Sequence, residues 1–248
     1  MSEPDRGAPA ARELTGVVLG HVDVGEADRI VRLLCEGEGR VDVMARGARS
    51  SRRRFGGALE PGTRVRAVAR RGRGTLAWLE EIEVRALPRL ARADLDRMVL
   101  MHHGCEVIGA LAEVGEDVSR ELRLLEVWLE LLEGEVAPGE ASRVAFEAKA
   151  LTFAGLAPAL RLCVACGRAL TDPARFNFED GGGLHAGCGA GEPALAGDLA
   201  EIDALRHTPL AETLGAPTPA SRWLMVRFIE YQVRRPLRAR ALLEGGGA

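Results

Sequence analysis

The sequence lacks a long hydrophobic segment. In its 248 residues, no apolar run approaches the roughly 18 to 20 residues that a membrane-spanning helix needs. The N-terminal residues MSEPDRGAPAARE include acidic side chains and have no hydrophobic centre, which argues against a secretory signal. We therefore expect a soluble, cytoplasmic protein.

Cysteine is scarce, and the usual catalytic motifs are missing. Five cysteines in a chain of this length fit a reduced compartment with a metal site better than a disulfide framework. No G-x4-G-K-[S/T] phosphate loop is present, and Ser50 and Ser51 have no identifiable base. His102 and His103 are expected to be surface or core residues. These absences predict a protein that is not an enzyme.

Lysine is almost absent, and arginine is concentrated in one segment. Lys149 is the only lysine, so nearly all positive charge is guanidinium. Residues 40–78 contain eleven arginines and two acidic residues, a balance of +9 in a chain whose net charge is -3. Residues 94–147 contain four arginines and thirteen acidic residues, a balance of -9. The first segment therefore favours binding of phosphate groups, and the second repels them.

Short segments with strand-like composition recur in the first 90 residues, separated by glycine and charged turns. They are residues 14–21, 29–35, 40–46, 63–70 and 75–84. Five short strands predict a small antiparallel barrel or sandwich. In the fourth strand small apolar residues alternate with arginine. One face contains Val65, Ala67 and Ala69, and the other contains Arg64, Arg66 and Arg70.

We predict that nucleic acid binds the arginine-rich segment, because guanidinium binds phosphate through two hydrogen bonds and stacks on bases. Phe55 is a candidate platform for an unpaired base. The first 90 residues contain only one other aromatic residue, Trp78, so contacts to the nucleic-acid backbone should dominate. The alternative is a solvated loop without a partner. The candidate DNA-binding residues are Arg46, Arg49, Arg52, Arg53, Arg54, Arg64, Arg66, Arg70 and Arg71.

Beyond Pro88 the hydrophobic period changes from 2 to about 3.6, which predicts helices. Leu122, Leu125, Leu129 and Leu132 fall at spacings of 3, 4 and 3 and form a stripe that should face a core. Further helices are expected at residues 94–114, 141–154, 197–207 and 220–234. In the last of these, Leu224, Phe228 and Tyr231 are expected to be core residues.

Residues 162–193 show neither the hydrophobic period of 2 that is typical of strands nor the period of about 3.6 that is typical of helices, and they are rich in glycine and cysteine. They contain Cys163, Cys166, His185 and Cys188 in a C-x2-C-x18-H-x2-C arrangement. Two ligand pairs of this kind can converge on one tetrahedral zinc ion. Four protein ligands leave no open position for water, so the zinc would be structural. The alternatives are coincidental cysteines in a surface hairpin and a zinc hydrolase with an open metal site.

Several of these motifs together resemble the bacterial recombination mediator family RecO. The resemblance rests on GEADRIVRLL, the ARGAR turn, GALEPG, CVACG and the later GGGLHAGC, and it extends from Leu14 to about Leu237. It matches Arg46, Gly47 and Arg49 to the basic turn after the third strand. It matches three of the cysteines to zinc ligands, whereas His185 stands where the family usually has cysteine.

The resemblance implies an α+β protein with an N-terminal OB-fold barrel and an all-α C-terminal domain that contains a zinc-binding insert. The expected boundaries are a disordered leader at 1–13, the OB-fold at 14–87, and the helical domain at 88–248 with the insert at 162–193. It also implies a non-catalytic DNA-repair mediator that binds single- and double-stranded DNA and promotes strand annealing. Its implied partners are RecR, the C-terminal tail of single-stranded DNA-binding protein and, indirectly, the recombinase RecA. The alternative is an RNA-binding or ribosome-associated protein with an OB-fold and a zinc ribbon.

Overall fold

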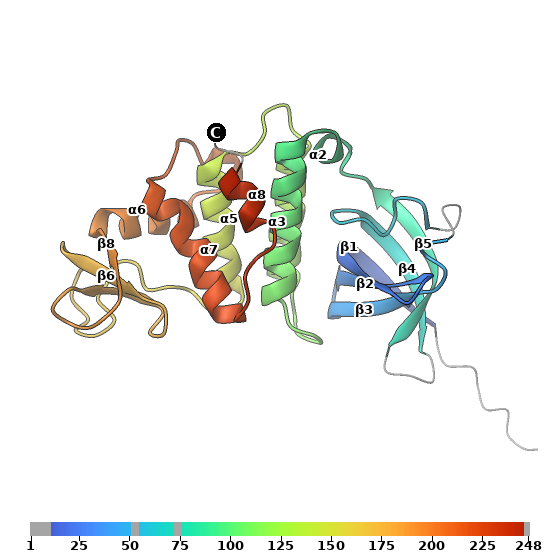
Figure 1. The fold of residues 1–248 in the computed structure, drawn as a ribbon, viewed down its shortest axis with the longest axis horizontal. Coiled ribbons are helices and arrows are strands. Elements are labelled where there is room, and N and C mark those ends of the chain that lie inside the picture. The colour runs from blue at the N-terminus through green and yellow to red at the C-terminus, as the bar shows by residue number, and fades with distance from the viewer. Residues whose placement is uncertain (1–10, 51–54, 72–75, 246–248) are drawn as a thin grey trace, which may run out of the picture. The chain divides into compact units, whose positions relative to one another are not determined.

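The chain forms two compact units in the computed structural model, which describes residues 11–50, 55–71 and 76–245 (Figure 1). Of the described residues, the first unit contains those up to Pro88 together with 112–122, and the second contains 89–111 and those from 123 onward. Five strands make up most of the first unit, and helices make up most of the second. The α+β class predicted from the sequence is confirmed.

The first unit is a closed five-stranded barrel. Its strands are β1 (Ala11–Val24), β2 (Asp28–Cys35), β3 (Gly39–Ala45), β4 (Arg64–Arg71) and β5 (Ala77–Ala86). Their order is β1-β2-β3-β5-β4, and β1 pairs with both β2 and β4 to close the barrel. All pairings are antiparallel except the short parallel contact between β3 and β5. This is the predicted OB-fold.

The first strand begins at Ala11, three residues before the expected start at Leu14. Its first residues pair with the end of β4, with Ala11 opposite Arg70 and Glu13 opposite Val68. Residues 11–13 are exposed, so the alternation that reveals a half-buried strand is missing from them. Residues 1–10 of the expected leader lie outside the described part of the chain.

The barrel core contains the apolar face predicted for β4. Val65, Ala67 and Ala69 are each 1% exposed, so the predicted alternation is confirmed. Phe55 is 4% exposed and belongs to the same core, so its prediction as a stacking platform is wrong. Cys35 is also a core residue, as expected, and burial raises the pKa of its thiol to about 12.

Helices form the second unit around a central, almost fully buried helix. They are α2 (Arg89–Ala93), α3 (Leu95–Leu111), α4 (Ser119–Leu132), α5 (Glu140–Phe153), α6 (Ala196–His207), α7 (Pro219–Val233), α8 (Arg240–Gly245) and the 3-10 helix η1 (Leu210–Glu212). The central helix α5 packs against α3, α6 and α7. Among the helices that the structure describes, none is both long and apolar enough to cross a membrane.

A Trp–Phe pair joins three helices in this core. Trp128 of α4 packs against Phe146 of α5 with the rings tilted and their centroids 4.9 Å apart, and its Nε1–H donates to the Leu100 carbonyl of α3 at 3.1 Å. Gly104 of α3 allows this approach, because a Cβ there would lie 2.6 Å from the indole ring. The predicted leucine stripe of α4 is confirmed, since all four of its leucines are buried.

Two expectations for the helices are wrong. Helix α3 ends at Leu111 rather than Val114, because Gly115 has a positive φ of 80° and Val114 forms a β-bridge with Gly39. Tyr231 is 47% exposed instead of buried. It lies in the last turn of α7 and stacks on Phe178 at 5.8 Å, whereas Phe228 is buried as expected.

The cysteine-rich insert folds as a small sheet. Its strands β6 (Ala174–Asn177), β7 (Gly182–His185) and β8 (Glu192–Ala194) are arranged in the order β7-β6-β8. The turn between β6 and β7 is closed by the Asn177 side chain, whose Oδ1 accepts from the backbone N–H of Glu179 at 2.8 Å. The hairpin brings His185 back opposite Ala174.

Candidate nucleic-acid surface and metal centre

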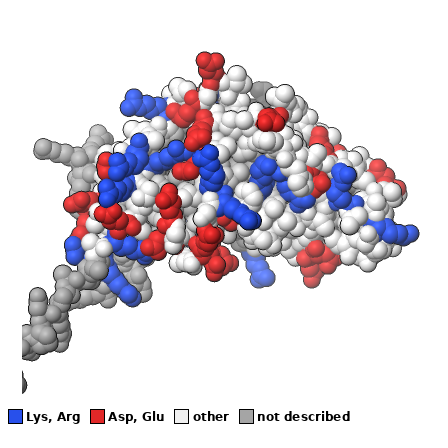
Figure 2. Space-filling view, turned by 180° about the vertical axis from the view of Figure 1, so that it is seen from behind, with Lys and Arg blue, Asp and Glu red and all other residues white. Residues whose placement is uncertain are grey.

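The arginines of β4 lie on the outer face of the barrel, but acidic side chains of neighbouring strands pair with them. Arg66 donates to Glu13 of β1 at 2.7 Å, and Arg70 donates to Glu80 of β5 at 2.5 Å. The hydrogen bond from Arg70 lowers the pKa of Glu80, so the carboxylate is charged at neutral pH. Figure 2 shows positive and negative side chains interspersed over the visible face of the barrel.

The basic turn after β3 is held by the β1–β2 turn. Arg49 donates to the Gly25 carbonyl at 2.9 Å and lies 3.4 Å from Asp23. The Gly47 N–H donates to Asp28 at 2.9 Å, and Gly47 has a positive φ of 66° that favours glycine. Hydrogen bonds to Gly25 and Asp28 therefore hold the basic turn in place as far as Arg49.

The remaining predicted arginines fall into three groups. Arg64 is half-buried and Arg71 is exposed, both on β4. Arg46 is exposed, and its guanidinium lies over the ring of Trp78 on β5. Arg52, Arg53 and Arg54 lie outside the residues that the structure describes.

Sequence reasoning missed the position of Trp78. On β5 the buried Leu79 alternates with Trp78 and Glu80, which places the indole on the outer face of the barrel. The same alternation was visible in the sequence, next to Glu80, Glu81 and Glu83. The aromatic residue on the barrel surface is therefore Trp78, and the buried one is Phe55.

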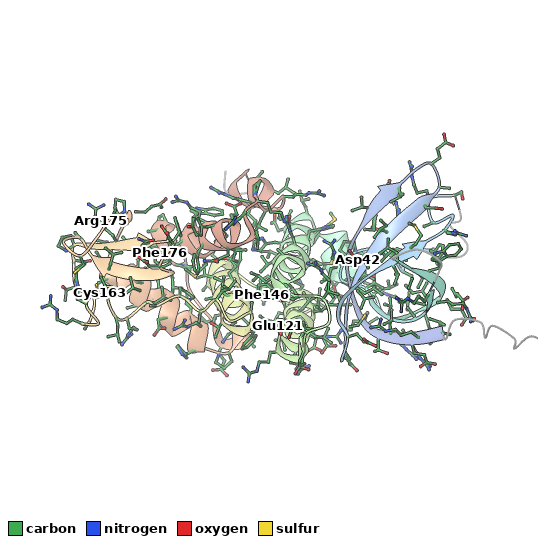
Figure 3. All side chains as sticks on the ribbon, turned by 90° about the horizontal axis from the view of Figure 1, so that it is seen from below. Asp42, Glu121, Phe146, Cys163, Arg175 and Phe176 are labelled. Atoms are coloured by element: carbon green, nitrogen blue, oxygen red, sulfur yellow. The ribbon has the colours of Figure 1, made fainter. Side chains whose placement is uncertain are left out.

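The four predicted metal ligands converge in the insert. Cys163 and Cys166 lie in the turn of a short hairpin that the Leu162–Ala169 bridge closes, and His185 ends β7 shortly before Cys188. Figure 3 shows Cys163 beside the small sheet, while Phe176 of β6 packs on Phe228 of α7 with ring centroids 5.4 Å apart. The sheet thus positions His185 within the cluster and packs on α7 through Phe176.

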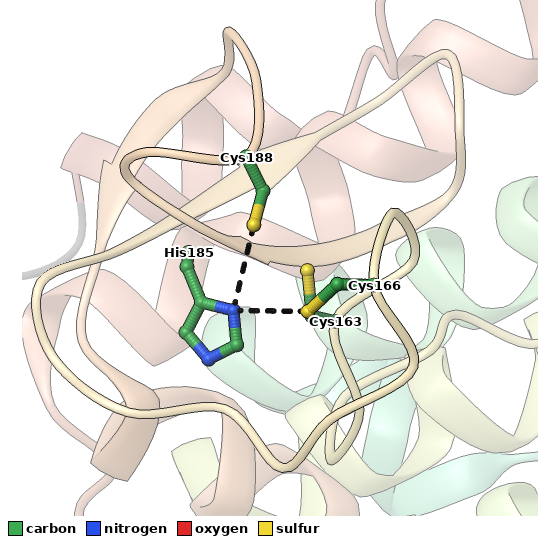
Figure 4. Close-up of side chains that lie close together, drawn as sticks. All are labelled: Cys163, Cys166, His185 and Cys188. Carbon is green, nitrogen blue, oxygen red and sulfur yellow. Dashed lines mark hydrogen bonds between the residues drawn. The ribbon is translucent and has the colours of Figure 1, made fainter.

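The distances within the cluster fit a tetrahedral metal ion. The candidate ligand atoms all lie within 4.8 Å of one another (Figure 4). His185 Nδ1 is 3.5 Å from Cys166 Sγ and 3.8 Å from Cys188 Sγ. In a tetrahedral zinc site the S···N separation would be about 3.5 Å, given Zn–S and Zn–N bonds of about 2.3 and 2.0 Å. The cluster of three thiols and one imidazole can therefore bind a metal ion.

Hydrogen bonds around the cluster favour the protonation states that metal ligands need. His185 Nε2 donates to the Ala169 carbonyl at 3.0 Å, which leaves Nδ1 as the ligand atom. Burial raises the pKa of Cys163, but backbone hydrogen bonds from His185, Cys166 and Ala165 offset this effect and lower the pKa to about 6. A hydrogen bond from Arg168 lowers the pKa of Cys166. Both thiols therefore ionise readily, as metal ligands must.

Glycine is required on the strand that leads to His185. A Cβ on Gly182 would lie 2.6 Å from Val164 Cγ1, and one on Gly183 would lie 2.4 Å from Leu170 Cδ1. Val164 and Leu170 belong to the segment that contains the C-x2-C pair. The absence of side chains at Gly182 and Gly183 therefore allows the two ligand pairs to approach each other.

Both halves of the chain match known families. The family described as Recombination protein O N terminal matches residues 12–87, and the family described as Recombination protein O C terminal matches residues 92–241. Together these matches span the barrel, the helices and the cysteine insert.

Similar proteins are known from several bacteria. The DNA repair protein RecO of Anaeromyxobacter sp. (strain K) is 39% identical over 243 residues, which cover 94% of this chain and 95% of the relative. The DNA repair protein RecO of Myxococcus xanthus is 35% identical over 230 residues, covering 90% and 93%. That of Geobacter sulfurreducens is 40% identical over 177 residues, covering 70% and 71%. The chain therefore belongs to the RecO family of DNA repair proteins.

Proposed function

We propose that this protein is a recombination mediator that binds single- and double-stranded DNA through its barrel and promotes annealing of complementary strands. With RecR, it assists the loading of RecA onto DNA coated by single-stranded DNA-binding protein. It does so in the cytoplasm, in association with the nucleoid. The observation that supports this most is the match of both halves of the chain to the RecO family.

The arginines of the barrel are the proposed DNA contacts. Phosphate competes with carboxylate for guanidinium, so DNA would displace the exposed pairs that Arg66 and Arg70 form with Glu13 and Glu80. Exposed pairs of this kind contribute little to stability, so exchanging them for phosphate contacts costs little free energy. In these pairs the carboxylates also offset the positive charge of the surface when no DNA is bound, which limits nonspecific association.

The metal in this proposal is zinc, and its role is structural. Three thiolates and an imidazole are a ligand set that zinc prefers, and they fill the four positions of a tetrahedral site. Zinc would fix the insert and would not activate water, so the proposed protein performs no covalent chemistry. Replacing His185 by alanine should then reduce zinc content and stability, whereas a zinc hydrolase would lose a measurable turnover.

The salt dependence of DNA binding tests the arginine surface. If about five phosphates of a single strand are neutralised, a plot of log K against log salt should have a slope of roughly -3 to -4. The triple variant Arg49→Ala, Arg52→Ala, Arg53→Ala removes three of these contacts and should flatten the slope to about -1.4. Fluorescence anisotropy with a labelled oligonucleotide at several salt concentrations measures both slopes.

The matched control removes three arginines from the end of the helical unit. Arg234, Arg235 and Arg238 are exposed and follow α7. Replacing all three by alanine should leave the slope unchanged. An unchanged slope in the barrel variant together with a flattened one in the control variant would move the DNA surface to these C-terminal residues.

The tail of single-stranded DNA-binding protein is proposed to bind at α7. This tail is acidic and ends in phenylalanine, so its binding site requires basic and apolar residues together. Exposed Tyr231 stacks on Phe178, and the guanidinium of Arg227 lies 5.5 Å from the centroid of the same Phe178 ring. Replacing Tyr231 by alanine should weaken binding of a tail peptide by about two- to twelvefold, which corresponds to the loss of one aromatic contact of about 0.5–1.5 kcal/mol. Calorimetric titration of the peptide measures the change, and equal affinity in the variant would place the tail elsewhere.

A further inference from the structure

Two consecutive residues of the cysteine insert, Arg168 and Ala169, contact three of the four candidate metal ligands. The Arg168 carbonyl accepts from the backbone N–H of Cys163 at 2.8 Å. The backbone N–H and the guanidinium of Arg168 both donate to Cys166 Sγ. The Ala169 carbonyl accepts from His185 Nε2 at 3.0 Å. This short segment therefore orients ligands from both pairs.

The backbone of Arg168 is held by the hairpin that contains the C-x2-C pair. Ala169, the next residue, forms the β-bridge with Leu162 that closes this hairpin. Gly167, the preceding residue, donates its N–H to the Cys163 carbonyl at 2.8 Å and so closes the turn. The bridge and the turn together fix the position from which the Arg168 side chain reaches the cluster.

The guanidinium of Arg168 has thiols as its charge partners. Arg175, the other arginine of the insert, donates to the Gly191 carbonyl at 3.0 Å. Within the described part of the chain, no carboxylate forms an ion pair with Arg168. The charged groups that act on its guanidinium are the three cysteines of the cluster, Cys163, Cys166 and Cys188. The cation therefore belongs to the metal cluster rather than to a surface ion pair.

The charge of the ligand set explains why a cation is useful at this position. Three thiolates and a neutral imidazole carry three negative charges, of which a divalent zinc ion offsets two. The loaded site would keep one negative charge. A guanidinium that donates to one of the thiolates brings the sum to zero, and hydrogen bonds between charged groups are the strong ones.

We infer that Arg168 is a positioning residue of the metal site, which balances the charge of the three thiolates and holds Cys166 in place for zinc. This rests on the zinc site of the proposed function and extends it to a residue outside the four ligands. Cys166 depends most on such a partner, because it is exposed, whereas Cys163 is buried. Residues that orient metal ligands contribute about 10- to 100-fold to metal affinity.

The zinc affinity of the full-length protein tests this role. Arg168→Gln removes the charge but leaves the backbone N–H, which can still donate to Cys166 Sγ. This variant should bind zinc about 10- to 100-fold more weakly than the wild type, measured by competition with a fluorescent chelator. Arg168→Lys keeps the positive charge and should lose clearly less affinity than Arg168→Gln.

Arg161→Gln is the matched control. Arg161 lies two residues before Cys163, just as Arg168 lies two residues after Cys166. Its side chain is 65% exposed, and its ion-pair partner is Asp203 at 4.0 Å. Because Arg161 does not contact a ligand sulfur through this pair, the variant should bind zinc as tightly as the wild type.

Cobalt in place of zinc gives a readout that a merely structural role would not change. The guanidinium lowers the energy of the electrons on Cys166 Sγ. Its removal in Arg168→Gln should therefore shift the sulfur-to-cobalt charge-transfer absorption to longer wavelength. The ligand-field bands, which report on tetrahedral geometry, should keep their positions. A change in the ligand-field bands would mean that Arg168 only supports the local fold, and it would overturn the inference.

The other contrary results are distinguishable from one another. A wild-type protein that binds no zinc overturns the metal site itself and this inference with it. Tight zinc binding by the wild type, with equal affinity in Arg168→Gln, overturns only the inference and leaves the four-ligand site intact. Equal losses of affinity in Arg168→Gln and Arg168→Lys would contradict the charge-balancing role.

Discussion

Replacing Cys166 by serine is expected to remove most of the bound metal and to lower the thermal stability of the purified protein. Cys166 is exposed, so the substitution leaves no cavity, and its effect reports on ligation alone. Even residues that only orient zinc ligands contribute 10- to 100-fold in metal affinity, so loss of a ligand should cost more than about 100-fold. Metal analysis of the purified protein should find about one zinc per chain in the wild type and little in the variant.

A cysteine outside the cluster provides the control. Cys105 is 1% exposed and lies on α3, away from the ligands that converge in the insert. Cys105→Ala should lose some packing energy but keep its full metal content. If Cys166→Ser retained one zinc per chain, the four-ligand site would be wrong, and the insert would be stable for another reason.

Replacing Glu147 by alanine is expected to destabilise the helical unit by about 3 to 5 kcal/mol, the usual cost of leaving a buried charge unpaired. Glu147 of α5 is fully buried, and its Oε1 accepts from Arg143 Nη1 at 2.6 Å and from His103 Nε2 at 2.8 Å. Both partners are also fully buried. Without the carboxylate, the Arg143 guanidinium remains in the core with a weaker set of acceptors.

The same arginine offers a matched control. Glu140 accepts from Arg143 Nη2 at 2.6 Å, but its side chain is 38% exposed, so water can replace it. Glu140→Ala should therefore cost less than about 1 kcal/mol. Urea unfolding followed by circular dichroism compares the two variants. Equal losses of unfolding free energy in the two variants would mean that the burial of a carboxylate does not determine its contribution to stability.

The architecture was predictable from the sequence because its signals are local. Alternation of arginine with small apolar residues predicts the buried and exposed faces of β4, and the paired C-x2-C and H-x2-C spacings predict the metal cluster. The start of β1 at Ala11 was not predictable, because residues 11–13 are exposed and pair with β4, a strand distant in sequence.

The chemistry of the barrel surface depends on pairings between strands that are distant in sequence. A count of charge along the chain makes residues 40–78 strongly positive, but β1 and β5 place Glu13 and Glu80 beside Arg66 and Arg70. Phe55 was misplaced for the same reason, since only the closed barrel shows that it fills the core.

Annealing of complementary strands tests the central claim most directly. The strands are coated with single-stranded DNA-binding protein, and duplex formation is followed by fluorescence transfer between labels at their ends. The proposed mediator should accelerate annealing, and the Arg49→Ala, Arg52→Ala, Arg53→Ala variant should do so less. No acceleration, together with tight binding of RNA, would contradict the account and favour an RNA-binding protein.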